Sequence, residues 1–299
     1  MAAGGARPRA PLAGLFALSA ALVTAAVVRA APAPAPASEA DFVRILSGTF
    51  TMGSPEDEPG HFHDETLHRV TLTRAFDLCR HPVTQDEWRA TMGWDESKFA
   101  GDSLRPVENV TWFDAVAYCN ARSRREGRTP AYVITDTART GHHITGADVR
   151  WVREADGYRL PTDAEFEYVC RAGTTTAFPS GPVTVADPRG CSRERNLEEI
   201  AWYCANSGGG THPVMTKAPN AWGLFDMSGN VQQWCWDWFS VPGHDPVTDP
   251  TGPAGGSVRI WRGGGWNYDP RHCRAADRGR DGPDEHFPEI GLRVARGGR

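Results

Sequence analysis

The chain has 299 residues and a net charge of −5, a length that allows one large domain or two small ones. Its acidic balance and its lack of a basic run argue against nucleic acid and anionic membrane surfaces as partners. The 32 glycines and 23 prolines predict short elements joined by many loops, so the 11 tryptophans must supply much of the core.

The N-terminal segment differs in composition from the rest of the chain. Residues 1–30 contain three arginines and no acids, and their apolar run over 12–28 leads into a Val-Arg-Ala stretch ending at Ala30, which is typical of a signal peptide over residues 1–30. The alternative is an N-terminal membrane anchor. Residues 31–40 begin with alternating Ala and Pro and predict an extended tether. We therefore expect residues 41–299 to form one mature domain that is secreted, periplasmic or at the cell surface, without stable membrane insertion.

Three helices are predicted by the same N-terminal signal. A threonine hydroxyl is followed three residues later by an acid, so that each can cap a backbone N–H group of the first turn. These pairs are Thr84 and Glu87, Thr111 and Asp114, and Thr162 and Glu165. They predict helices over 85–92, 112–124 and 163–171, the last ending at Gly173.

Short strands are predicted between and after these helices. Residues 42–52 and 68–76 are each typical of one strand, and Trp234, Trp236 and Trp238 alternate so that their rings share one strand face. Residues 126–155 resemble an insertion containing a hairpin, in which 133–134 lie near 149–151. Residues 259–262 and 291–295 are two further strand candidates.

Seven cysteines remain in the predicted mature domain: Cys79, Cys119, Cys170, Cys191, Cys204, Cys235 and Cys273. An exported domain favours disulfides, but an odd count leaves at least one thiol unpaired, and the pairing stays open. Because no Cys-x-x-Cys motif occurs, the sequence indicates neither a structural zinc site nor a thioredoxin-like redox pair.

Several segments resemble one known family when they are taken together and in order. They are Gly48–Gly53, His81–Gln85, Pro106–Ala115, Tyr158–Tyr168, Asn220–Val231, Arg262–Trp266 and Gly291–Val294. Over residues 41–299 the chain resembles the formylglycine-generating, or sulfatase-modifying, enzyme family. The resemblance implies a single α+β domain with a C-type-lectin-like fold, few short helices and strands, and little regular structure.

The oxidase of that family converts a cysteine of a client sulfatase to formylglycine with copper and oxygen. Its copper lies between two cysteines five positions apart, and the matching residues here are Tyr268 and Cys273. A phenol is a hard oxygen donor and does not replace a thiolate toward Cu(I). Gly265 and Gln232 also replace a serine and a tryptophan of the family's site. We therefore expect no copper and no formylglycine generation, and Cys273 is either a catalytic residue or a disulfide partner or buried apolar side chain.

The resemblance also implies a structural calcium ion. The matching positions are Asp226, Gly229, Val231 and Gln233, where the glutamine replaces a carboxylate and removes a charge. The alternative is a tight turn in which Asp226 and Asn230 bond to the backbone.

Histidines offer a different kind of metal site. His61, His63, Asp64 and Glu65 could provide ligands for iron in a non-heme oxidase. The same residues are also typical of a solvated loop, because Pro59-Gly60 precedes them. His142 and His143 adjoin, and we expect both at the surface.

Residues 266–289 have the composition of a recognition surface, since aromatic, Arg and His residues alternate with turn-formers. The candidate binding residues are Trp266, Asn267, Tyr268, Asp269, Arg271, His272, Arg274, Asp277 and Arg278. The segment also resembles the variable C-terminal region of lectin-like proteins diversified by retroelements, in its Trp-Asn-x-x-Pro-x-x-Cys-Arg-Ala-Ala run. The alternative is a solubilising loop, in which four arginines pair with Asp269, Asp277, Asp281 and Asp284.

These observations favour an exported module that binds a protein or a small ligand outside the cytoplasm through residues 266–289. The alternative is a copper- or non-heme iron-dependent oxidase that acts on a peptide or a small molecule.

Overall fold

Three helices begin at the threonine caps that the sequence predicts. The computed structural model describes residues 1–5 and 41–297, and the larger part contains α1 Gln85–Met92, α2 Trp112–Arg125 and α3 Asp163–Arg171. At each N-terminus the threonine oxygen accepts the backbone N–H of the acid, and the acid accepts the N–H of the threonine. All three predicted helices are thus confirmed. A short helix, α4 Arg195–Glu198, was not predicted.

The predicted signal peptide and tether lie outside the described residues, apart from residues 1–5, which form no helix or strand. Within the residues that the structure describes, no helix is both long enough and apolar enough to cross a membrane.

Strands of two to nine residues form three sheets and one hairpin. One sheet has the order β1-β4-β13-β7, a second β11-β10-β8-β12 and a third β2-β3-β9, and β5 pairs with β6 alone. The strands are β1 Phe42–Ile45, β2 Gly48–Met52, β3 His68–Leu72, β4 Phe76–Cys79, β5 Tyr132–Thr140, β6 His143–Trp151, β7 Tyr158–Arg159, β8 Gln232–Trp238, β9 Val247–Thr248, β10 Arg259–Arg262, β11 Gly279–Asp281, β12 Ile290–Leu292 and β13 Ala295–Arg296.

Three predicted strands are each divided in two. Residues 42–52 form β1 and β2, residues 68–76 contribute to β3 and β4, and residues 291–295 contribute to β12 and β13. In every case the two halves belong to different sheets: β1 pairs with β4, for example, whereas β2 pairs with β3. The chain therefore changes sheet within each segment, which local alternation of side chains cannot reveal.

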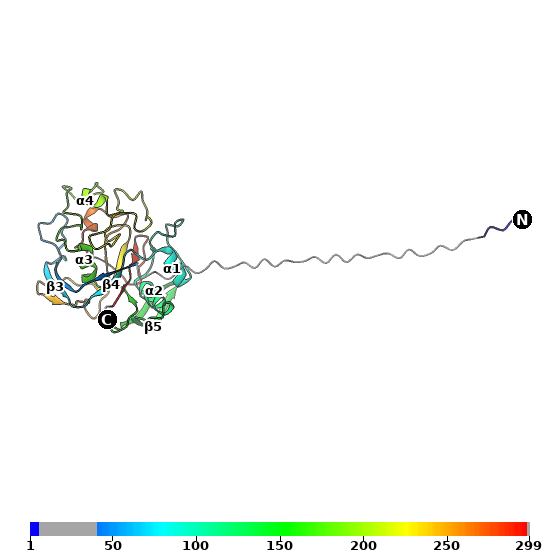
Figure 1. The fold of residues 1–299 in the computed structure, drawn as a ribbon, viewed down its shortest axis with the longest axis horizontal. Coiled ribbons are helices and arrows are strands. Elements are labelled where there is room, and N and C mark those ends of the chain that lie inside the picture. Colours follow the sequence, from blue (N-terminus) through cyan, green and yellow to red (C-terminus); the bar gives the residue numbers. More distant parts are fainter. Residues whose placement is uncertain (6–40, 298–299) are drawn as a thin grey trace. The chain divides into compact units, whose positions relative to one another are not determined.

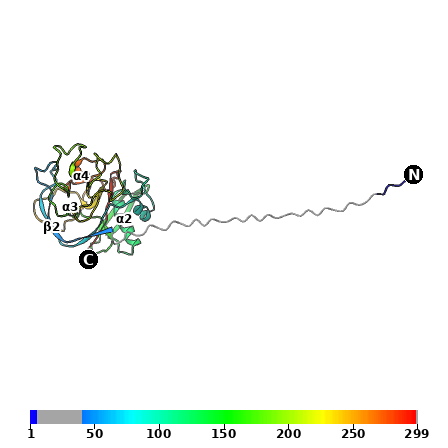
Figure 2. The ribbon, with the colours of Figure 1, turned by 45° about the horizontal axis from the view of Figure 1, so that its top comes forward.

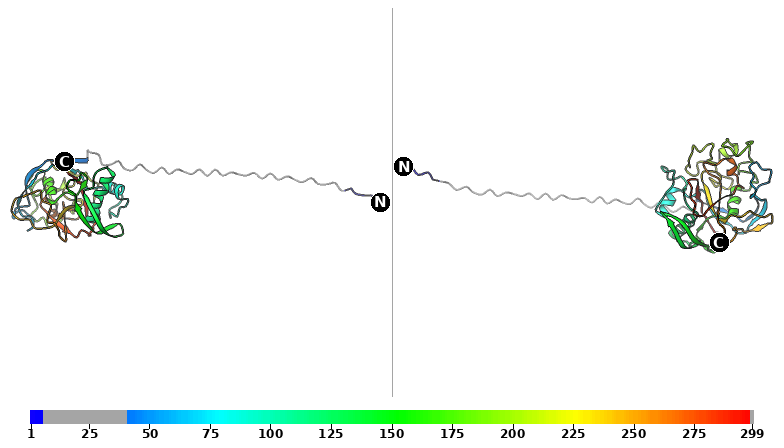
Figure 3. Two further views of the ribbon diagram at one scale, coloured as in Figure 1. Left: turned by 90° about the horizontal axis from the view of Figure 1, so that it is seen from below. Right: turned by 180° about the vertical axis from the view of Figure 1, so that it is seen from behind.

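The tryptophan strand and the insertion hairpin are confirmed. Trp236 of β8 stacks on Tyr132 of β5 and contacts Trp112 of α2, with ring centroids 5.2 and 5.5 Å apart. The Arg259 guanidinium lies 3.7 Å from the Trp112 ring and 3.5 Å from the Trp238 ring. The hairpin β5–β6 lies beside α2 in Figure 1 and at the edge of the domain in both views of Figure 3.

The core of residues 41–297 has three parts. The largest surrounds α2 and β8, and the second lies between α3, β3 and β4. Figure 2 shows α3 between β2, at one edge, and α2. The third part is small and consists of Ala177, Phe178, Leu197, Ala201, Tyr203 and Cys273.

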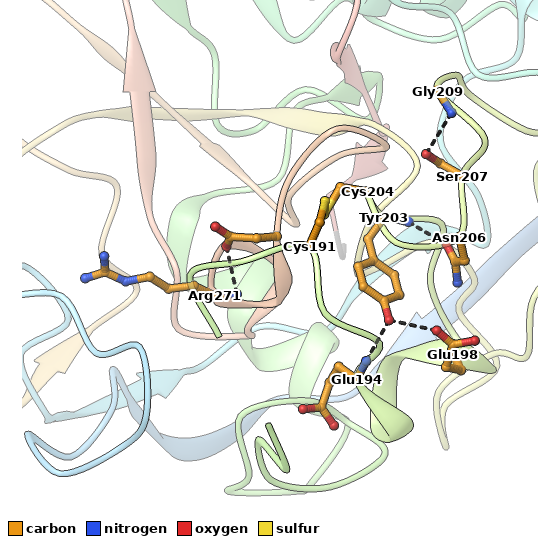
Figure 4. Close-up of a disulfide and its surroundings, with 10 residues drawn as sticks. Cys191, Glu194, Glu198, Tyr203, Cys204, Asn206, Ser207, Gly209 and Arg271 are labelled. Carbon is orange, nitrogen blue, oxygen red and sulfur yellow. Dashed lines mark hydrogen bonds between the residues drawn. A yellow bond between two sulfur atoms is a disulfide. The ribbon is translucent and has the colours of Figure 1, made fainter. Parts of the chain in front are cut away.

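One disulfide closes the loop beside this third part. Cys191 is bonded to Cys204, and the five other cysteines are free and buried. Figure 4 shows the neighbouring Tyr203, whose hydroxyl accepts the Glu194 N–H at 2.7 Å and donates to the Glu198 carboxylate at 2.8 Å. The expectation of a disulfide is confirmed, and the structure answers the open question of pairing.

Candidate functional site

The position that matches the family's copper site contains one thiol in an apolar environment. Cys273 is fully buried in the third part of the core, and burial raises the pKa of its thiol well above the ordinary value. Tyr268 is half-buried and makes an edge contact with His272, with the ring centroids 5.0 Å apart. A buried neutral thiol and a phenol do not fit a Cu(I) ion held by two thiolates.

Tyr268 and Gln232 lie next to each other. Burial raises the pKa of Tyr268, and the neighbouring Gln232 side chain opposes that increase. Gln232 begins β8 and is buried, whereas Tyr268 follows β10 on a turn. Two positions at which the sequence departs from the family's site are therefore neighbours, and neither side chain is a thiolate.

The predicted calcium turn is closed by hydrogen bonds. The two carboxylate oxygens of Asp226 accept the Met215 N–H at 2.9 Å and the Asn230 side-chain amide at 3.1 Å. Gln233 donates to the Asp226 carbonyl at 2.8 Å and accepts from Arg293 at 2.7 Å. The bond from the Met215 N–H to Asp226 is of the kind that the tight-turn alternative predicts.

Gly229 and Val231 belong to the same turn, and the first adopts a left-handed backbone with φ of 74°. There a Cβ atom would approach the Trp202 carbonyl oxygen to 2.3 Å, so only glycine fits. Calcium at this turn stays a prediction, to be tested by metal analysis.

The arginines of residues 266–289 do not pair with the acids of their own segment in the way that the alternative predicts. Arg274 reaches Glu65 at 2.5 Å and Glu58 at 2.8 Å, Arg278 reaches Asp163 at 2.9 Å, and Arg280 reaches Asp64 at 3.3 Å. These contacts join the segment to the 58–65 loop and to α3, so it forms part of the folded domain.

Three of the predicted binding residues are inaccessible. Arg274, Asp277 and Arg278 are buried, with 1%, 2% and 8% of their surface exposed. Arg274 and Arg278 use their guanidinium donors within the protein, and Asp277 contacts His272 at 3.4 Å. These three residues are therefore structural, and the candidate surface contracts to residues 266–272.

The remaining candidate side chains are fixed by neighbours from other elements. Trp266 donates its indole N–H to the Pro288 carbonyl at 3.0 Å and meets the Phe99 ring edge-on. Arg271 donates to the carbonyl oxygens of Gly60 and His61, and its guanidinium lies 3.4 Å from the Phe62 ring.

His272 and Asp269 are held in a similar way. His272 packs between Phe62 and Tyr268. Burial alone would lower the pKa of His272, but the hydrogen bond with Asp277 and the charges of Asp277 and Asp269 together outweigh this effect, and the pKa is raised. Asp269 accepts the Arg271 N–H at 3.1 Å, while Asn267 stays exposed. We name residues 266–269, 271 and 272 the aromatic face.

The 61–65 loop is not solvated throughout, contrary to one of the two predictions. Asp64 and Glu65 are buried because they bind Arg280 and Arg274. His61 and His63 instead line an open groove of about 640 Å³ with His244, which the sequence did not indicate as a neighbour. Among residues 1–5 and 41–297, no three His, Cys, Asp or Glu side chains are placed to hold a metal ion.

Only one of the two adjacent histidines is at the surface. His142 is exposed, but His143 is buried, where its ring nitrogens contact Asp114 at 2.8 Å and Glu96 at 2.9 Å. The hydrogen bond to Asp114 raises the pKa of His143. The predicted surface position of His143 is wrong because the chain turns this ring toward the N-terminus of α2.

Comparison with known proteins agrees with this architecture. The model of the sulfatase-modifying factor enzyme 1-like domain matches residues 28–297. The chain belongs to this family. The fold prediction, a single α+β domain of the formylglycine-generating type, is thereby confirmed.

Three relatives illustrate the breadth of the family. Chaperone protein LppX of Paenibacillus barcinonensis is 35% identical over 76% of this chain and 81% of its own. The formylglycine-generating enzyme of Mus musculus is 32% identical over 86% of this chain, which spans 63% of the mouse protein. The structure of Treponema denticola variable protein 1 has a TM-score of 0.72 and 32% identity, covering 85% of this chain and 94% of its own.

Proposed function

We propose that this family member is an exported binding module that recognises a partner protein through the aromatic face and does not generate formylglycine. The observation that carries the proposal is the rigid support of that face. Trp266, Tyr268, Arg271 and His272 come from one short segment, yet each contacts a residue from elsewhere in the fold. Aromatic and arginine side chains held in place lose little conformational entropy on binding, and this favours recognition.

The replacement of the copper donor set supports the same proposal. Cys273 is buried against apolar side chains, while Tyr268, at the other donor position, is a phenol whose neighbours include Gln232 and Trp261. One relative, LppX, is named a chaperone, a role that requires contact with another protein. The signal-like composition of residues 1–30 supports export.

Site-specific photocrosslinking in the native host tests the proposal. A photoreactive amino acid replaces exposed Asn267, and a matched control carries it at exposed Val133 on the hairpin β5–β6. We expect one discrete protein adduct from position 267, none from position 133, and loss of the adduct when Tyr268→Ala is added. An absent adduct, or one unaffected by Tyr268→Ala, contradicts the proposal.

The alternative is an oxidase that uses a metal elsewhere in the domain. The groove containing His61, His63 and His244 is the observation in its favour, since imidazoles bind iron and copper. Metal content and oxygen consumption with a thiol reductant, measured on purified mature protein, distinguish the two. We expect no stoichiometric copper or iron and no oxygen uptake; stoichiometric metal with uptake that is lost in His63→Ala would establish the oxidase. The same analysis measures bound calcium.

A further inference from the structure

A second candidate site lies away from the aromatic face, at the end of β8. A cavity of about 240 Å³ opens between the N-terminus of α3, the last residues of β8 and the loop at 240–252. Its lining includes Met52, His68, Asp163, Asp237, Trp238 and Val247. The volume is below the range of drug-sized pockets, about 300–1,000 Å³, and suits a small molecule.

Of the two aspartates that line this cavity, Asp163 is paired with arginines and Asp237 makes no ion pair among the described residues. Asp237 is 3% exposed, and its Oδ2 atom accepts the backbone N–H of Asp163 at 2.9 Å. Among the described residues, its second oxygen, Oδ1, accepts no hydrogen bond, and Asp237 makes no ion pair. An unpaired buried carboxyl is costly unless it is protonated or a cation reaches it.

The charged groups nearby are already satisfied. Asp163 accepts from Arg262 at 2.5 Å and from Arg278 at 3.0 Å. Arg278 also donates to the carbonyl oxygens of Asp64 and Ser240. The cavity therefore offers an acidic group whose neighbouring arginines are engaged elsewhere, and it lacks a free cation to bind an anionic ligand.

His68 adds a second hydrogen-bond acceptor. Its Nδ1 atom lies 2.8 Å from the Thr66 carbonyl oxygen, which can only accept, so Nδ1 carries the proton. In the neutral ring Nε2 is then an acceptor, and Nε2 has no partner among the described residues. Two acceptors and apolar walls from Met52, Val247 and Trp238 favour a ligand with hydrogen-bond donors at one end and a carbon body.

We propose that this cavity binds a small organic molecule bearing a primary ammonium group, which seats against Asp237. The ammonium group supplies the positive charge and the hydrogen bonds that the carboxylate lacks, and the carbon body packs on the apolar wall.

Binding is linked to the protonation of Asp237. Burial, followed by the charge of Asp163, raises the pKa of Asp237 to about 8, so the free protein is largely protonated there at pH 7. The ammonium complex requires the carboxylate, and binding therefore releases a proton at pH 7. The titratable and charged groups around it are Asp163 and Glu165 of α3, Arg259 and Arg262 of β10, His68 of β3, and Arg278.

Calorimetry with two probes of equal size tests the proposal. Cyclohexylamine and cyclohexanol are titrated into the mature protein at pH 7, each in phosphate and in HEPES, whose heats of ionisation differ. We expect the amine to bind at least about tenfold more tightly than the alcohol, the effect of one charge-assisted hydrogen bond. We also expect the measured heat of amine binding to differ between the two buffers. The difference should equal the difference between the buffers' heats of ionisation for each proton released. Equal affinity of the two probes, no binding, or amine binding without proton release would overturn the proposal.

Variants locate the bound amine. Asp237→Asn keeps the shape and the acceptor for the Asp163 N–H, and we expect it to lose about tenfold in amine affinity together with the proton release. Asp245→Asn, an exposed carboxylate of the same loop, should change neither. Gly243→Phe fills open space at the rim and should weaken both probes. If Asp237→Asn folds, by circular dichroism, and still binds the amine normally, the assignment fails.

Discussion

At the scale of single residues, buried arginine side chains connect the loops of this domain. Arg262, Arg274 and Arg293 are among its largest fully buried side chains. Arg293 alone donates to the carbonyl oxygens of Cys79, Phe225 and Asp226 and to the Gln233 side chain. A guanidinium has five N–H donors in a rigid fork, so one side chain satisfies several loop carbonyls that no strand or helix would otherwise pair.

Loss of Arg274 tests this role. Arg274→Met keeps most of the volume but removes the arginine partner of the fully buried Glu65 carboxylate, which should cost about 3–5 kcal/mol in the free energy of unfolding. Arg280→Met is the control, because Arg280 is 45% exposed and its loss should cost less than about 1 kcal/mol. Urea denaturation measures both, and equal losses would show that Arg274 is not structural.

Glu108 gives a pH-dependent prediction. The residue is fully buried, and burial raises its pKa to about 7 despite the hydrogen bond from the Phe99 N–H. Between about pH 4 and pH 7 the folded protein holds a proton that the unfolded chain has released, so stability falls as pH rises. Glu108→Gln removes this dependence and should be more stable than the wild type by about 3 kcal/mol at pH 8, with little difference at pH 4.

Thermal and urea unfolding of both proteins across that pH range would show the effect. Glu285→Gln, the same substitution at an exposed position, is the matched control. A constant difference for Glu108→Gln would contradict the raised pKa.

Helix caps and sheet changes determine the structure at the scale of elements. The capping boxes of α1, α2 and α3 depend on residues three positions apart, so local sequence specifies them. The strands depend on distant partners instead: β12 pairs in parallel with β8, and β13 pairs with β4 and β7. The caps were therefore predicted to the residue, whereas the strand boundaries were not.

Two caps with different surroundings allow a matched test. Thr84→Ala removes a cap of α1 and should cost about 1 kcal/mol. Thr111→Ala should cost about 1 kcal/mol more, because Thr111 also donates to the Ile144 carbonyl at 3.0 Å and ties α2 to β6. Equilibrium unfolding of both variants, with Thr111→Ser as a conservative control that keeps the hydroxyl, measures the difference; equal costs would exclude the added contribution.

At the scale of the whole domain, the C-terminal segment completes the interior. Cys273 closes the third part of the core, Arg262 and Arg278 meet α3, and Arg274 holds the 58–65 loop. The surface left for recognition is thus backed by contacts from all over the chain. This arrangement explains how a domain with short elements can present a fixed set of side chains.

Thiol chemistry reports on the integrity of that interior. All five free cysteines are buried, and burial raises the pKa of Cys273, so the folded protein should expose almost no reactive thiolate. Titration with a chromogenic disulfide should find less than about one thiol in the folded protein. Five should react in denaturant without reductant, because Cys191 and Cys204 are joined. Rapid reaction of Cys273 in the folded state would contradict its structural assignment.

The sequence by itself determined the family, the α+β class, the three helices and the tryptophan face of β8, because these depend on short-range patterns and on ordered motifs. It also identified Tyr268 and Gln232 as departures from the family's site, but not that they lie next to each other. Only the tertiary structure decided which residues of 266–289 are accessible. Arg274 and Arg278 are buried against Glu65 and Asp163, which are distant in sequence, and the buried Asp277 contacts the nearby His272. The sequence also could not predict that Asp237 makes no ion pair, because its neighbours in the fold come from segments that are distant along the chain.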